Sequence, residues 1–540
     1  MNFEFSSRRS PVYATKGVVA SSQPLASAAG IEILRNGGNA ASAAVAVAAS
    51  LNVTEPTSTG IGGDVFVLYY DHKTKKVFSL NGSGRAPANL SLDRLEKEGL
   101  TELPPYHPYT VTVPGACDAW FTLNEKFGNR PMNEVLSPAI ELATKGFPVA
   151  PLTSYFWQAA AQRQLKFAKN GDQLLINGNA PQPGQIFKNP GLAKTFSLIA
   201  KEGREAFYQG IIGEAVVKVI NESGGCLSLS DLENHHSDWV EPIAVEFNDA
   251  KIWECPPNGQ GLAALIALKL FDEIKNNVDL SNQTQRLHWL IEVMKLAFSD
   301  AWAYISDPDF YQTPMDWLLS DEYAKERSKL INPTKANQTV EHGTPPATSD
   351  TVYFCVVDKE GNACSFINSN YMGFGAGIVP SGFGFSLQNR GHNFSLTKGH
   401  PNQLEPGKRP YHTIIPAMAT NKDNNQLIGP FGVMGGFMQP QGHMQVAINL
   451  FEEHLDPQTS LDKPRFCILP ENAANEVAIE EGFDFRTLSE LSDMGHAVKP
   501  VSGMKRAIFG RGQIIIRNNE GVLSAGSDPR ADGCALPLIF

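Results

Sequence analysis

The sequence predicts an α+β fold, and three patterns along the 540 residues indicate it. Residues 287–298 carry apolar side chains at helical spacing, within a middle part of the chain that is mainly helical in pattern. Short apolar runs at 65–70 and 77–80, separated by a turn, are typical of a β-hairpin. A second strand, turn and strand are predicted at 352–367, so helices and strands share one long chain.

Two helices are expected ahead of the first hairpin. Pro24 falls in the first turn of one helix, and Gly37 and Gly38 end it near residue 36. The second, alanine-rich helix covers 40–51, and Glu55-Pro56 terminates it. Its small side chains predict close packing against a neighbouring element. A loop over 57–64 then leads into the strand at 65–70.

The remaining elements follow in order. Residues 131–307 are predicted to be mainly helical, and 333–350 form an exposed linker rich in Pro, Thr, Asn, Gly and Ser. Strands are expected at 352–357 and 363–367, directly after the linker, and again at 384–387, 426–428 and 507–517. The glycine cluster at 373–377 is interpreted as a turn that brings backbone close to another group, functional or structural.

Composition excludes several classes of protein. A formal net charge of −11 argues against a nucleic-acid surface, which needs clustered Lys and Arg. Seven scattered cysteines without a CxxC pair predict neither a disulfide framework nor a zinc site. The apolar run at 40–53 is too short to cross a bilayer. Residues 1–16 lack the apolar region of a secretory signal, so cytoplasmic residence is expected.

The candidate chemistry lies at the end of the linker. The sequence has no GxSxG, HExxH or GxxxxGK[ST] motif. Thr351, however, begins a predicted strand directly after a cleavable loop. Cleavage of the Asp350–Thr351 bond would free an α-amine of pKa about 8 on the nucleophile itself, and this amine could serve as its general base. On spacing alone, an ordinary strand threonine is the commoner explanation.

A family resemblance changes that balance. It rests on segments spread over nearly the whole chain: 37–40, 60–64, 113–115, 146–149, 292–298, 351–358, 373–375, 435–436 and 528–530. In identity and order these segments resemble the γ-glutamyltranspeptidase family, and within it the YwrD-like and cephalosporin (glutaryl) acylase branch. The resemblance implies an N-terminal-nucleophile hydrolase with a four-layer αββα sandwich, built jointly by two subunits that autocatalysis produces from one precursor.

The resemblance also assigns catalytic roles. Thr351 becomes the nucleophile, with 1–350 as the large subunit and 351–540 as the small subunit that carries much of the central sheet. Ser369 retains the hydroxyl that would contact the Thr351 amine. Gly435 and Gly436 match the glycine pair whose N–H groups form the oxyanion hole, although without the resemblance an ordinary Gly-Gly turn would be the favoured explanation.

The substrate pocket departs from the pattern of glutathione-cleaving relatives. Arg85 is shifted from the position that holds the substrate's α-carboxylate, so carboxylate binding and a surface salt bridge are equal alternatives. Tyr371, Arg390 and Asn393 replace residues that hold the α-ammonium group, and Arg390 adds a positive charge there. His412 and Thr413 replace a Ser-Ser pair, and His412 is either a carboxylate donor or structural. The pocket therefore suits an acyl group that ends in a carboxylate, such as glutaryl.

The sequence thus predicts a self-processing enzyme that cleaves γ-glutamyl amides such as glutathione through an acyl-enzyme on Thr351. Water or an amine would accept the acyl group. The alternatives are a glutaryl- or cephalosporin-type acylase with little glutathione activity, and an unprocessed, non-catalytic member of the family. Because nucleophile and base are one residue, no metal or cofactor is predicted. The expected partners are the small-molecule amide and the other processed subunit, without nucleic acid or membrane.

Overall fold

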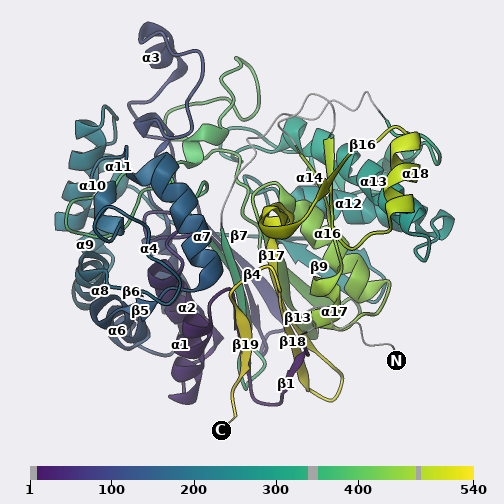
Figure 1. The fold of residues 1–540 in the computed structure, drawn as a ribbon, viewed down its shortest axis with the longest axis horizontal. Helices are drawn as coiled ribbons and strands as arrows, with labels where there is room; N and C mark the ends of the chain where they lie inside the picture. The colour runs from purple at the N-terminus through teal and green to yellow at the C-terminus, as the bar shows by residue number, and fades with distance from the viewer. Residues whose placement is uncertain (1–8, 338–350, 470–475, 540) are drawn as a thin grey trace.

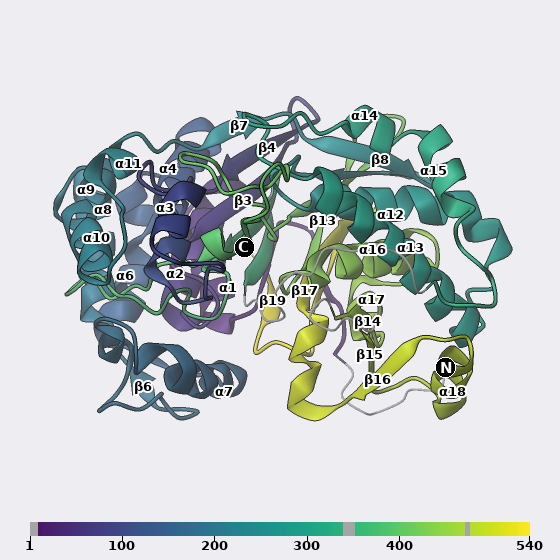
Figure 2. The ribbon, with the colours of Figure 1, turned by 90° about the horizontal axis from the view of Figure 1, so that it is seen from above.

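Two β-sheets packed face to face form the centre of the molecule, and helices cover their outer faces (Figures 1 and 2). The computed structural model describes residues 9–337, 351–469 and 476–539. Helices α1, α2 and α4 lie on the outer side of one sheet, and α12, α16 and α17 lie on the outer side of the other (Figure 1). The arrangement is the predicted four-layer αββα sandwich.

The first sheet has seven strands, and it contains strands from both sides of the expected cleavage position. Strands β10 and β11 pair with each other, while β2 and β3 flank them. The order across the sheet is β19 (Cys534–Pro537), β2 (Val18–Ser21), β10 (Val352–Val357), β11 (Ala363–Ser369), β3 (Asp64–Asp71), β4 (Lys76–Gly82) and β7 (Asp238–Val240).

The second sheet also combines early and late parts of the chain. Its order is β1 (Val12–Ala14), β18 (Leu523–Ser527), β17 (Arg511–Arg517), β13 (Leu427–Met434), β12 (Ala417–Asn421), β9 (Ala250–Glu254) and β8 (Ile243–Phe247). A small sheet of β14 (Phe466–Ile468), β15 (Glu476–Glu480) and β16 (Ala497–Val501) and the pair β5 (Phe147–Pro148) and β6 (Ile186–Phe187) lie apart from both.

Three hydrophobic cores separate the layers. Phe66, Tyr353, Ile367 and Met418 belong to the core between the two sheets. The helices over the first sheet are α1 (Pro24–Arg35), α2 (Ala40–Thr54), α4 (Ala116–Phe127), α6 (Ser137–Lys145), α7 (Pro151–Ala160), α8 (Pro190–Glu202) and α10 (Ile211–Glu222). Those over the second are α12 (Gly261–Ile274), α13 (Gln283–Tyr304), α16 (Met438–Phe451), α17 (Pro457–Asp462) and α18 (Phe485–Asp493).

The remaining α-helices are shorter. They are α3 (Leu92–Lys97), α5 (Met132–Val135), α9 (Glu205–Tyr208), α11 (Leu229–Glu233), α14 (Met315–Leu318) and α15 (Asp321–Ser328). None of the helices in the described ranges is both long and apolar enough to cross a membrane. All seven cysteines are free thiols, and six of them are buried.

The turn between β10 and β11 is hydrogen bonded to the N-terminus of α2. Gly361 has a φ of +89°, which glycine adopts without strain. Asp358 accepts hydrogen bonds from the Asn362 backbone N–H at 2.9 Å and from the Ala40 N–H at 2.9 Å. The second bond places a carboxylate at the N-terminus of α2, where the helix dipole favours negative charge. The alanines of α2 are fully buried, so this helix packs close to both strands.

Most expected elements are present. The middle of the chain is mainly helical as expected, but it also contains an unpredicted hairpin, β8–β9, at residues 243–247 and 250–254. Two expected strands differ. Residues 384–387 form no strand. Gly384 has a φ of +68°, and the Leu387 backbone N–H donates to the Ile378 carbonyl rather than to a neighbouring strand. Within the expected strand at 507–517, a 3₁₀ helix covers Gly503–Phe509 and β17 begins only at Arg511. Of the expected linker, residues 338–350, Asp350 included, lie outside the described residues.

Candidate active site

Thr351 and Ser369 meet at one end of the first sheet. In the antiparallel pair β10–β11, Val352 lies opposite Asn368, which places Thr351 opposite Ser369. The two hydroxyl oxygens are 3.0 Å apart, and both side chains are fully buried. The Tyr371 backbone N–H donates to Ser369 Oγ at 2.8 Å. The hairpin register therefore holds a second hydroxyl directly against the candidate nucleophile.

Tyr371 forms a platform for Arg390. It is a non-glycine residue with a φ of +78°, a conformation that is uncommon and that often occurs at functional sites. The Arg390 guanidinium carbon lies 4.3 Å from the centroid of the Tyr371 ring, in cation–π geometry. Because Tyr371 also bonds to Ser369, the turn after β11 links the guanidinium to the two hydroxyls.

Arg390 is fully buried but only partly hydrogen bonded. Its Nη1 donates to Thr413 Oγ1 at 2.6 Å. Its Nε and Nη2 have no hydrogen-bond partner in the described structure, and the Asp64 carboxylate is 4.0 Å from Nε. Burial lowers the pKa of Arg390 to about 10, against the opposing effect of Asp64, so the group is cationic at neutral pH. A buried cation with two unused donors is suited to a ligand carboxylate.

His412 uses both ring nitrogens inside the protein. Its Nε2 lies 2.9 Å from Asp64 Oδ2, and its Nδ1 is 3.4 Å from the Ile414 backbone N–H. Burial, followed by the charge of Arg390, lowers the His412 pKa to about 4. A neutral ring with Nε2–H donating to Asp64 and Nδ1 accepting from Ile414 fits this environment. His412 orients the Asp64 carboxylate in this structure.

Gly435 and Gly436 lie in the turn between β13 and α16. Their φ values are +132° and +57°. Their carbonyls accept from the backbone N–H groups of Met438 and Gln439, at 3.0 and 3.2 Å. In the described part of the chain, neither glycine N–H donates a hydrogen bond. Two adjacent unused donors are what an oxyanion hole requires.

Two of the expected pocket residues bond to protein groups instead. Asn393 donates its side-chain amide to the Tyr411 carbonyl at 3.0 Å and so supports the segment that carries His412 and Thr413. Arg85 forms a salt bridge to Asp238 at 3.4 Å, with 21% of its side chain exposed. Of the two alternatives for Arg85, the structure contains the salt bridge.

Sequence reasoning assigned no role to Asp64, Gln388 or Gln260. Asp64 accepts from the Gly84 N–H at 2.9 Å and from Gln388 Nε2 at 3.0 Å, in addition to His412. Asp64 follows three glycines in the segment 60–64, so a polar residue after a glycine-rich turn was the available signal. Gln260 lies between Gly259 and Gly261, so it had a similar local signal, but its contacts are to backbone groups distant in sequence.

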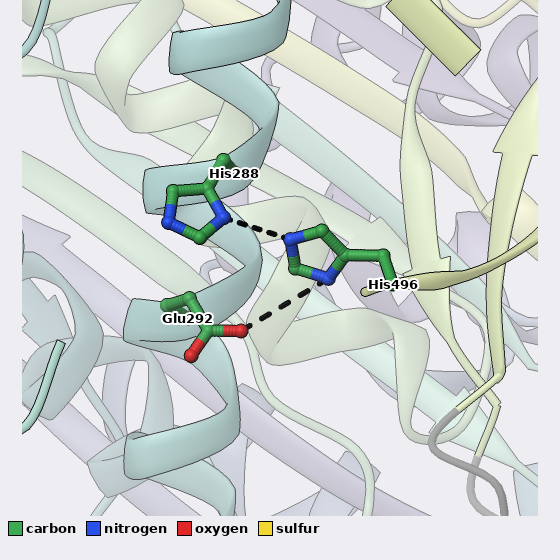
Figure 3. A group of neighbouring side chains, drawn as sticks. All are labelled: His288, Glu292 and His496. Atoms are coloured by element: carbon green, nitrogen blue, oxygen red, sulfur yellow. Dashed lines mark hydrogen bonds and ion pairs between the residues drawn. The ribbon is translucent and has the colours of Figure 1, made fainter. Parts of the chain in front are cut away.

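Three buried side chains, His288, Glu292 and His496, form the cluster in Figure 3, the one group in the described ranges whose composition could hold a metal ion. His288 Nδ1 and His496 Nε2 are 2.8 Å apart, and His288 Nε2 bonds to the Asn332 carbonyl at 2.7 Å. Lys295 Nζ lies 2.8 Å from Glu292 Oε1 and already neutralises it. A divalent ion would meet this ammonium group, so the cluster is better explained as a buried polar network. The absence of a metal from catalysis stays a prediction.

The family follows from comparison with known proteins. A family model described as Gamma-glutamyltranspeptidase matches residues 26–538. The chain belongs to the γ-glutamyltranspeptidase family. As in the hydrolases and transferases of this family, its fold is the α+β sandwich of an N-terminal-nucleophile enzyme.

Individual relatives of the family differ in the substrates that their names give. The chain is 34% identical to the Glutathione hydrolase-like YwrD proenzyme of Bacillus subtilis, covering 98% of this chain and 99% of that protein. It is 30% identical to the Oxamate amidohydrolase proenzyme of Klebsiella pneumoniae, covering 96% and 98%. The crystal structure of cephalosporin acylase from Bacillus halodurans matches with a TM-score of 0.91 and 43% identity, covering 100% and 99%.

Proposed function

We propose that this γ-glutamyltranspeptidase family member is a self-processing amide hydrolase and acyl transferase whose nucleophile is Thr351. The observation that carries the proposal is the 3.0 Å contact between Thr351 Oγ1 and Ser369 Oγ at the head of β10. Two relatives are named as proenzymes, which supports processing of this chain, and the bond that we propose is Asp350–Thr351. Cleavage there would give a large subunit of 1–350 and a small subunit of 351–540.

The proposed reaction needs only groups of this chain. The free α-amine of Thr351 takes the Oγ1 proton while Oγ1 attacks the amide carbonyl. The N–H groups of Gly435 and Gly436 stabilise the oxyanion, and the amine returns the proton to the departing nitrogen. The acyl group is then an ester on Thr351, which water or an amine cleaves by the same steps. Ser369 orients Oγ1 through its hydroxyl.

The proposed acyl group carries a carboxylate, and Arg390 is its anchor. The unused Nε and Nη2 of Arg390 present two donors from one buried guanidinium. Thr413 and Tyr371 fix the plane of this group through the Nη1 bond and the ring contact. One substrate carboxylate, bound through both of its oxygens, would accept from both free donors without displacing Thr413 or Tyr371.

Two acyl groups fit this anchor. γ-Glutamyl is the first candidate, in line with the glutathione hydrolase-like relative. Glutaryl, which lacks the α-ammonium group, is the second. It is favoured because the buried Arg390 guanidinium repels an ammonium group near it, and the neutral amide of Asn393 supplies no negative charge to offset this repulsion.

A quenched-reaction experiment tests the proposal. The protein is mixed with γ-glutamyl or glutaryl p-nitroanilide, quenched in acid, and the small subunit is analysed by tandem mass spectrometry. The expected result is an acyl ester on Thr351, more abundant with the preferred substrate. An ester on another residue, or turnover without an acylated species under single-turnover conditions, would contradict the mechanism.

A further inference from the structure

Gln260, between β9 and α12, joins two segments of the candidate active site. It is fully buried and directly precedes α12. Its Nε2 donates to the Thr413 carbonyl at 2.6 Å and to the Gly436 carbonyl at 2.8 Å. Its Oε1 accepts from the Tyr411 hydroxyl at 3.1 Å. One amide nitrogen therefore ties the 411–413 segment to the glycine turn.

The two carbonyls belong to residues with separate tasks. Gly436 supplies one of the two unused N–H donors of the candidate oxyanion hole. Thr413 accepts the hydrogen bond that orients Arg390. The Gln260 backbone N–H adds a further bond, to the His412 carbonyl at 2.9 Å. Gln260 thus links the turn of the candidate oxyanion hole to the segment that supports the guanidinium, although it touches neither reacting group. The Ile415 N–H, which donates to Gln439 Oε1 at 2.9 Å, joins the same two segments outside this contact.

We propose that Gln260 is a positioning residue that sets the separation between the oxyanion hole and Arg390, and through it the length of acyl chain that the enzyme accepts. This inference rests on the proposed function and deepens it. A dicarboxylic half-amide must reach the oxyanion hole with its amide carbonyl and Arg390 with its carboxylate at once. The accepted chain length is therefore set by the distance between the oxyanion hole and Arg390.

The chemistry of the amide explains why glutamine suits this position. Its nitrogen donates twice and its oxygen accepts, whereas ionised glutamate only accepts. In Gln260→Glu, a carboxylate would face two carbonyl oxygens in a buried site. Burial would raise its pKa, and the protonated form could donate to one of the two carbonyls. The variant should gain activity as pH falls, relative to the wild type.

The test compares purified, processed wild type with Gln260→Met, Gln260→Glu and Tyr411→Phe. Succinyl, glutaryl and adipyl p-nitroanilides are assayed from pH 5 to 8, with glutarate as a competitive probe of the Arg390 site. Gln260→Met is expected to lower kcat on the order of tenfold, to weaken glutarate inhibition and to flatten the chain-length preference. Tyr411→Phe removes one bond to Gln260 and should change the same quantities in the same direction by less.

Gln445 provides the matched control. It is a buried glutamine of α16 whose Nε2 donates to the carbonyls of Gln441 and Phe466, at 3.0 and 3.2 Å. Gln445→Met and Gln445→Glu should lower stability without altering chain-length preference or creating a new pH dependence. This comparison separates positioning from general loss of packing.

Each outcome decides the inference. If the Gln260 variants change selectivity and Gln260→Glu gains relative activity at acid pH, the inference holds. The inference is overturned if Gln260→Met and Tyr411→Phe keep the kcat, the selectivity and the pH profile of the wild type. It is also overturned if the Gln445 variants change these quantities as much as the Gln260 variants do. If the Gln260 variants do not fold, Tyr411→Phe alone decides. An unprocessed, inactive wild type would instead overturn the proposed function, which keeps the two failures distinct.

Discussion

Asp64 and Arg390 face each other at 4.0 Å without a hydrogen bond, although both are fully buried. Asp64 bonds instead to His412, Gln388 and the Gly84 backbone. Its charge still helps to keep the guanidinium protonated, because an opposite charge nearby favours the charged form. The pair thereby combines a stable cation with two donors available to a ligand.

Replacing Arg390 should remove the discrimination for carboxylate-bearing acyl groups. Hydrogen bonds to charged groups contribute about 1.5–3 kcal/mol, so Arg390→Met should lower kcat/KM for glutaryl p-nitroanilide about tenfold to a hundredfold. Arg390→Lys keeps the charge but loses the planar fork and should recover only part of this. Butyryl p-nitroanilide, which has no carboxylate, is the reference substrate. Equal losses on both substrates would show that Arg390 does not bind the acyl carboxylate.

Gly435→Ala should impair catalysis without weakening substrate binding. At a φ of +132° an L-residue is strained, and an added Cβ would lie 3.1 Å from Gly510 Cα. Alanine keeps the backbone N–H, so the variant acts by displacing the turn that directs this donor; complete loss of an oxyanion-hole donor typically costs a factor of about 10² to 10³ in kcat. We expect slower processing and a fall in kcat up to that size, with KM nearly unchanged. A rise in KM at constant kcat would place the turn in substrate binding instead.

Ser369→Ala should slow both processing and turnover, because the hydroxyl that contacts Thr351 Oγ1 is lost. Ser369→Thr retains the hydroxyl and should be closer to wild type. Ser365 is the matched control: it lies on the same strand, is buried, and its hydroxyl bonds to the Tyr353 hydroxyl at 2.8 Å. Processing half-times by gel and kcat measure the effect. Similar rates of processing and turnover for Ser369→Ala and Ser365→Ala would show that Ser369 has no specific role in the mechanism.

The buried neutral His412 should make stability depend on pH. Its pKa is about 4 in the folded protein against 6.5 ordinarily, so between these values the unfolded chain binds more protons. Stability from this group is therefore complete above pH 6.5 and declines as pH falls toward 4, by at most about 1.4 kcal/mol per pH unit. His412→Gln lacks this titration. The wild-type minus variant difference in thermal midpoint should shrink on acidification, and a constant difference from pH 7 to 4.5 would contradict the assignment.

The sequence predicted most elements that have local signals, but not the side-chain contacts between distant segments. The β10–β11 hairpin follows from two apolar runs around Gly361, and its register alone brings Thr351 to Ser369. The hairpin β8–β9 was not predicted, although it had a local signal, two apolar runs around Asn248, which has a φ of +55°. By contrast, the bonds of Asp64 to His412 and of Gln260 to Gly436 join residues 348 and 176 positions apart. No local pattern encodes such contacts.

Intact-mass spectrometry of purified wild type beside Thr351→Ala tests the central claim most directly. We expect two fragments in the wild type, the smaller beginning at Thr351, and a single uncut, inactive chain in Thr351→Ala. A wild type that stays uncut, or a variant that is cut at the same bond and remains active, would contradict the assignment of Thr351 as nucleophile.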